Sequence, residues 1–112
     1  MRAFIRILEN KLHEIDKALA RHDFLSPKWY AYEFGIQLER TEQELELRDR
    51  SVSALPLTID AHELTEKLFS AIRGELERLR SCLVEQKLEA AQESLGAICS
   101  QLAQLDARLG DA

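Results

Sequence analysis

The spacing of apolar residues is the feature that most constrains the fold of this chain. Near both ends of the sequence, apolar side chains recur at alternating intervals of three and four residues. This period marks one narrow face of an α-helix, closer to a coiled-coil seam than to a broad globular face. The two series are Ile5, Leu8, Leu12, Ile15 and Leu19, and Leu88, Ala91, Leu95, Ile98, Leu102, Leu105 and Leu109. The sequence therefore predicts an all-α protein.

Breaks in this pattern divide the chain into four helices. Ser26 followed by Pro27 is typical of a helix start, and Pro56 lies in an apolar connection over residues 51–59. No Gly or Pro separates the last two helices, but their apolar stripes differ in direction by roughly 130°, which favours a short turn near residues 84–87. The predicted helices cover approximately residues 2–22, 27–50, 61–85 and 88–109 of a single domain, residues 1–112.

Four helices of similar length predict an antiparallel up-and-down bundle. The narrow seams of the first and last helices also predict a homodimer with coiled-coil-like contacts. In the two middle helices, the predicted core positions are Tyr30, Phe34, Leu38, Thr41 and Leu45, and Leu64, Leu68, Ile72, Leu76, Leu79 and Leu83.

Charge and cysteine content narrow the class of protein. The net charge of −5 argues against a nucleic-acid or anionic-membrane surface as the main partner. No run approaches the roughly 18 apolar residues of a membrane span. Cys82 and Cys99 form no CxxC motif, and each lies beside an apolar stripe, so we predict two buried structural thiols. This usage suits a reducing compartment and predicts a cytoplasmic protein.

Motifs for catalysis or cofactor binding are not found in the sequence. His62 has Glu66 one helical turn away, but a metal site would need a third and a fourth ligand from elsewhere, and HExxH is absent. His13, which lies beside Glu14 and Asp16, is expected to be an ordinary surface histidine as well. There is no Gly-rich phosphate loop or nucleophile elbow, and the carboxylates are spread over predicted helix surfaces. We therefore expect a binding protein with no catalytic residues, metal or cofactor, not an enzyme.

Aromatic residues crowd into one stretch, SPKWYAYEFG, near the start of the second predicted helix. The chain has one Trp, two Tyr and four Phe, and four of these residues lie here. At about 100° per residue, Tyr30 and Phe34 fall on the core side of the helix. Trp29, Tyr32 and Ile36 fall on nearly the opposite side, as a second apolar stripe about two turns long.

The sequence leaves three possibilities for what packs over this second stripe. Phe24, Leu25 or the connection over residues 51–59 can fold over it, a second copy of the chain can bind it, or a different protein can dock there. Gly35 lies at its border, where a missing side chain permits close approach. Trp and Tyr are enriched in the residues that dominate binding energy at protein interfaces. The predicted partner-binding residues are Trp29, Tyr32, Ile36, Phe24 and Leu25.

The leading functional hypothesis is a small acidic regulatory protein that occludes an apolar surface of another protein. An anti-activator that sequesters a transcription factor is one example. The first alternative is a secretion or assembly chaperone, which requires an elongated groove for an amphipathic client. The second is an accessory factor in replication or repair. Direct nucleic-acid binding would require a cationic groove beside the aromatic residues, and the charge balance disfavours one.

Overall fold

The described residues of the protein fold into four helices. The computed structural model describes residues 2–51 and 59–109, with side chains described for residues 2–45 and 63–109. The helices are α1 (Arg2–Ala20), α2 (Ser26–Ser51), α3 (Ile59–Glu85) and α4 (Leu88–Leu109). Each begins and ends within two residues of its expected position, and the described residues contain no strand. The predicted all-α helical bundle is confirmed.

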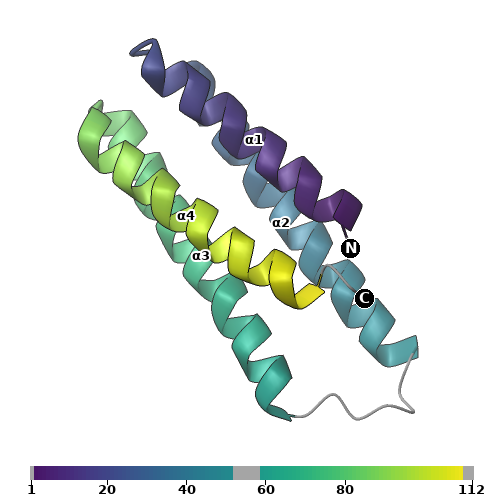
Figure 1. Ribbon diagram of the computed structural model, residues 1–112. Helices are drawn as coiled ribbons and strands as arrows, with labels where there is room; N and C mark the ends of the chain where they lie inside the picture. The colour runs from purple at the N-terminus through teal and green to yellow at the C-terminus, as the bar shows by residue number, and fades with distance from the viewer. Residues whose placement is uncertain (1, 52–58, 110–112) are drawn as a thin grey trace.

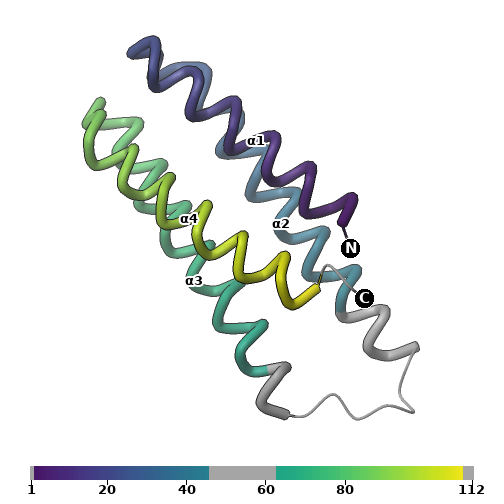
Figure 2. The backbone as a smooth tube through the Cα atoms, in the orientation of Figure 1, coloured from purple at the N-terminus to yellow at the C-terminus, as the bar shows by residue number. Residues whose placement is uncertain are grey.

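Two antiparallel hairpins make up the bundle (Figure 1). The contacts within each hairpin, α1 with α2 and α3 with α4, are more extensive than those between the hairpins. The bundle is closed where α1 packs beside α4 and α2 beside α3. Figure 2 shows that the turns within the two hairpins lie at the same end of the molecule. The result is an elongated rod with extents of 50 × 22 × 18 Å.

The apolar stripes of all four helices meet in one core. Both terminal series are buried as expected, except at Leu88, which packs partly buried against the core. On α3, however, the expectation for Leu64 was wrong, because its side chain is 43% exposed. Phe69, which was not assigned to the core, is buried there. Phe69, Leu76 and Leu83 recur every seven residues and therefore share one face, whereas Leu64 lies about 120° around the helix from Leu76, outside that face.

The turn expected near residues 84–87 is present, and its geometry explains why no Gly or Pro marks it. Gln86 adopts the left-handed conformation, with φ of 58°. Its backbone N–H donates to the Leu83 carbonyl at 3.3 Å, and the Lys87 N–H donates to the Cys82 carbonyl at 2.9 Å. These two bonds form a Schellman motif, which satisfies carbonyls at the end of α3. The same motif, with His22 at φ 56°, ends α1.

Replacing Gln86 with glycine is expected to raise the free energy of unfolding by about 0.5–1 kcal/mol. A side chain in the left-handed region costs about 1–2 kcal/mol, and the greater freedom of glycine in the unfolded chain offsets part of the gain. Urea denaturation followed by circular dichroism measures the change. Gln86→Ala is the control and gives no stabilisation, since alanine keeps the Cβ. Equal stabilities of the two variants would contradict this account of the turn.

The turn between α1 and α2 is stabilised by the Asp23 carboxylate. This carboxylate accepts hydrogen bonds from the backbone N–H groups of Leu25, at 3.0 Å, and Ser26, at 3.2 Å. The Ser26 hydroxyl and these two N–H groups lower the pKa of Asp23 below its ordinary value of 3.8. Hydrogen bonding to the charged form is the physical cause. Asp23 thereby holds the beginning of α2, which is the part of the helix that carries the clustered aromatic residues.

The contribution of Asp23 to the free energy of unfolding is expected to decrease at acid pH. Because the folded pKa is lowered, the contribution is complete above about 3.8 and is lost as pH falls through the folded value. Amide chemical shifts of Leu25 and Ser26, followed by NMR across this range, should report the transition. In Asp23→Asn, which keeps an acceptor but has no titrating group, these shifts should stay constant. A transition of the same size in both proteins would refute the assignment to Asp23.

Candidate protein-binding surface

The side of α2 that faces away from the core carries a continuous apolar surface. We call it the aromatic face and define it as Leu25, Trp29, Tyr32 and Ile36. The exposed fractions of these side chains are 77%, 63%, 52% and 39%, respectively. The Trp29 and Tyr32 ring centroids lie 6.1 Å apart, with the ring planes tilted by 33°. The two rings therefore form one tilted pair on the surface.

The aromatic face exists because the bundle covers only one side of α2. Ala31, Phe34 and Leu38 on the opposite side are buried against the other helices. Phe24 packs partly buried against the core, so it does not cover Trp29, and Leu25 is itself exposed. Of the predicted binding residues, Phe24 therefore lies outside the aromatic face. The expected packing of the connection over residues 51–59 falls largely on residues 52–58, which lie outside the described part of the chain.

Gly35 has a different role from the one expected. A Cβ placed on Gly35 would lie 3.4 Å from Cδ2 of Leu76 on α3, which is ordinary van der Waals contact. The half-buried glycine therefore faces Leu76 on α3, and not a chain that covers the aromatic face. On this flank, α2 is joined to α3 by an ion pair between Glu42 and Arg73. On the other flank, an ion pair between Glu33 and Lys11 joins α2 to α1.

Polar residues border the aromatic face. Lys28 and the Glu33 carboxylate lie beside it, and Arg40 and Gln43 follow it along the exposed side of α2. The helical part of the aromatic face, residues 29–36, extends over about 11 Å at 1.5 Å per residue. An apolar centre with a polar rim is the usual organisation of a protein interface.

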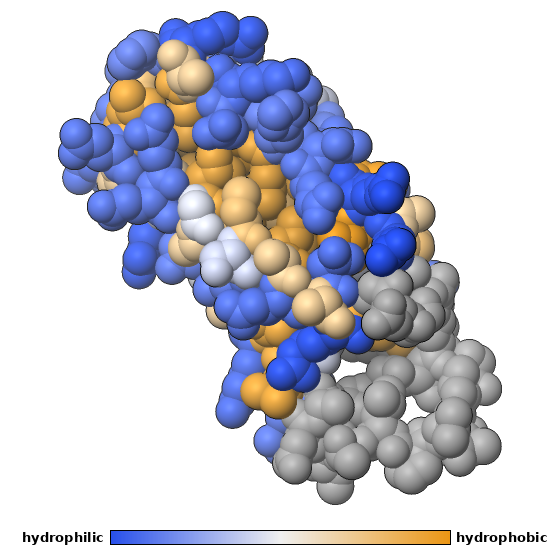
Figure 3. Space-filling view, viewed as in Figure 1, coloured by the Kyte–Doolittle hydropathy of each residue, from blue (hydrophilic) through white to orange (hydrophobic). Residues whose placement is uncertain are grey.

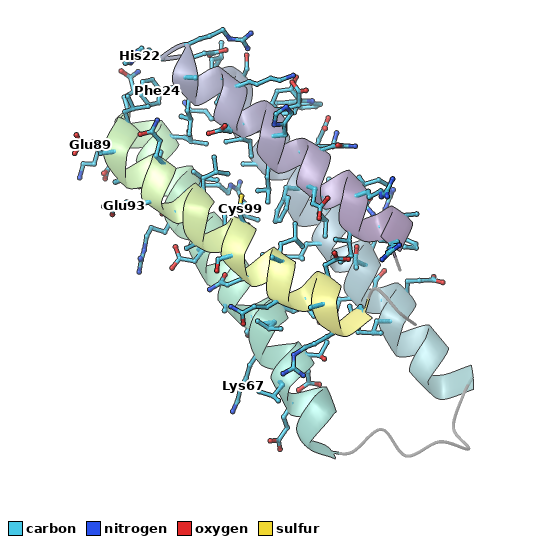
Figure 4. All side chains as sticks on the ribbon, in the orientation of Figure 1. His22, Phe24, Lys67, Glu89, Glu93 and Cys99 are labelled. Carbon is cyan, nitrogen blue, oxygen red and sulfur yellow. The ribbon has the colours of Figure 1, made fainter. Side chains whose placement is uncertain are left out.

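The two cysteines lie in different environments, which corrects the expectation that both are buried. Cys82 is buried in the core, whereas Cys99 on α4 is exposed. Figure 4 shows the Cys99 side chain between α4 and α1. Partial burial, followed by the nearby carboxylates of Asp16 and Glu9, raises the pKa of the Cys99 thiol. A raised pKa lowers the fraction of the nucleophilic thiolate at a given pH.

Metal-ligand clusters and membrane-spanning helices are the other features that bear on function. The described side chains include no group of three or more His, Cys, Asp or Glu placed to hold a metal ion together. None of the four helices, as far as its residues are described, carries an apolar run of the length needed to span a bilayer. Comparisons of the chain with models of known protein families, with curated proteins and with solved structures give no match.

Proposed function

We propose that this protein binds a different protein through the aromatic face and thereby occludes an apolar surface of that partner. The observation that carries the proposal is the exposure of Trp29, at 63%, and Tyr32, at 52%, on the side of α2 opposite the core. Removing apolar surface from water on binding contributes roughly 25 cal/mol per Å² of favourable free energy. Trp and Tyr are also among the residues that most often dominate binding energy.

The arrangement of the aromatic face suits docking into a groove. Trp29, Tyr32 and Ile36 stand at positions i, i+3 and i+7 of α2, and Leu25 immediately precedes the helix. This spacing places them on one side of the helix, in the way that an amphipathic helix is recognised by a hydrophobic groove. The partner surface is accordingly concave, apolar at its centre and polar at its edges.

Charge favours a different protein over a second copy of this chain. Two copies, each with a net charge of −5, repel one another at low ionic strength. A partner with a neutral or basic surface avoids this repulsion. If the covered surface is one that the partner uses for its own assembly, binding is inhibitory. A transcription factor held inactive in this way is the regulatory form of the proposal.

Affinity capture combined with sedimentation tests the proposed function. Wild-type protein should retain a specific partner from the native lysate, and Trp29→Ala/Tyr32→Ala should lose it while remaining helical. Val84→Ala is the matched control, because Val84 on α3 is 68% exposed and lies outside the aromatic face. It should retain the partner.

Sedimentation of the purified protein distinguishes a different protein from a second copy of this chain as the occupant of the aromatic face. Under the proposal, the wild type and the Trp29→Ala/Tyr32→Ala variant sediment alike in the absence of partner. A wild-type dimer that dissociates on the double substitution would instead make the aromatic face a self-interface and overturn the proposal.

A further inference from the structure

A second surface, separate from the aromatic face, lies in a groove between α1 and α4. Its volume is about 500 Å³. Figure 3 shows an apolar strip in the hollow between these helices, bordered by hydrophilic side chains. The residues that line the groove are Glu9, Leu12, His13 and Asp16 from α1, and Gln92, Leu95, Gly96, Cys99, Leu102 and Ala103 from α4.

Small residues on α4 keep the groove open. Gly96, Cys99 and Ala103 follow one another at intervals of three and four residues, so they share one side of the helix. A Cβ placed on Gly96 would have no atom within 4 Å, which means that space is free directly above the helix backbone. Between these residues, Leu12 and Leu95 supply the apolar floor.

The rim of the groove is acidic. Glu9 and Asp16 stand seven residues apart on the same side of α1, with His13 between them. Both carboxylates act on the Cys99 thiol, so their charges are felt inside the groove. On α4, Glu89 and Glu93 add negative charge along the outer side of the helix (Figure 4). Among the described residues that line the groove, none is Lys or Arg.

The length of the groove matches that of a short α-helix. The α4 wall from Gln92 to Ala103 measures about 17 Å at 1.5 Å per residue, which corresponds to three helical turns. Helices pack with their axes 8–10 Å apart, and small residues at the contact favour the shorter distances. We propose that this groove binds an amphipathic helix of another protein, with leucine-like side chains on the inner face and Lys or Arg along its edges.

The charge of the rim selects this occupant over a second copy of the chain. A cationic edge on the incoming helix pairs with Glu9 and Asp16, whereas a second copy brings a net charge of −5 toward carboxylates. Because the groove is formed by α1 and α4 and the aromatic face by α2, the inference does not depend on the proposed function.

The test uses a fluorescein-labelled 18-residue helical peptide with leucines on one face and lysines beside them. The comparison peptide has the same leucines, with glutamate in place of each lysine. Fluorescence anisotropy should show at least tenfold tighter binding of the lysine peptide to the native protein. At saturation, this peptide should slow alkylation of Cys99 by iodoacetamide at least tenfold. Equal affinities for the two peptides, or an unchanged alkylation rate, would overturn the proposal.

Matched variants locate the binding to the groove. Gly96→Leu fills the space above the floor and should weaken binding at least tenfold. Gly74→Leu makes the same change on α3, where a Cβ also meets no atom within 4 Å, and should bind like the wild type. Glu9→Gln/Asp16→Asn should also weaken binding at least tenfold, and this charge variant decides the outcome if Gly96→Leu fails to fold.

Two further variants test whether peptide binding depends on net charge alone and whether the peptide binds at the aromatic face. Glu63→Gln/Glu66→Gln removes two exposed carboxylates from α3 and serves as the control for net charge. It should bind the lysine peptide like the wild type, as should Trp29→Ala. A loss of binding in Trp29→Ala alone would move the peptide to the aromatic face and refute the groove. A loss of similar size in both carboxylate pairs would show non-specific attraction and overturn the proposal.

Discussion

Replacing Phe69 with alanine is expected to lower the free energy of unfolding by about 3–5 kcal/mol. The Phe69 side chain is 1% exposed and lies in the core. Its removal loses the transfer free energy of the ring and leaves a cavity that the neighbouring side chains fill only in part. Since small domains have total stabilities of about 5–15 kcal/mol, the variant should be close to the limit of folding.

Urea denaturation followed by circular dichroism measures this loss. The midpoint should fall with little change in slope, because the area exposed on unfolding is similar. Tyr32→Ala is the control, since it removes an aromatic ring that is 52% exposed. Its effect on stability should stay within about 0.5 kcal/mol. If Tyr32→Ala is as destabilising as Phe69→Ala, the assignment of the two rings to surface and core is wrong.

Replacing Trp29 with alanine is expected to weaken partner binding by about 2 kcal/mol or more, which is roughly 30-fold in the dissociation constant. The indole is the largest apolar group on the aromatic face, and its burial against the partner removes the most area from water. Folding should persist, because the side chain is 63% exposed in the free protein. Isothermal titration calorimetry with the captured partner measures the change.

Val84→Ala is the control for this second prediction. Val84 is more exposed than Trp29 but lies on α3, so its truncation should leave the affinity unchanged. The proposal fails if Trp29→Ala binds as tightly as the wild type. Loss of the helical spectrum in Trp29→Ala would show instead that the indole supports the fold.

The number and limits of the helices follow from the sequence because they depend on local spacing. The 3-4 intervals define each stripe, and the change of direction between the third and fourth stripes locates the turn before α4. Residue type alone does not reveal this turn, because Gln86 occupies a left-handed position that usually carries glycine. The placement of Trp29 and Tyr32 opposite the core of α2 also follows from the helical wheel, whereas their exposure of 63% and 52% does not, because the sequence left open whether another part of the chain covers them.

Features that depend on neighbouring helices were missed. Phe69 replaces Leu64 in the core because of the direction from which the other helices approach α3, although its seven-residue spacing to Leu76 was a usable signal. Gly35 contacts α3, and Cys99 lies in a groove that forms only when α1 meets α4. Homodimer formation and the binding of a different protein stay predictions.

The hairpin arrangement has a kinetic consequence. Most contacts between helices join helices that are adjacent in the chain, and those between α1 and α4 are a minority that joins the two ends of the sequence. Such low contact order is associated with folding in microseconds to milliseconds. Each hairpin is then a unit that can form early, and the hairpins meet only along α1–α4 and α2–α3, where the contacts are less extensive than within either hairpin. These two interfaces are where the units should separate first under stress. Hydrogen exchange should accordingly be faster along them than at the centre of either hairpin.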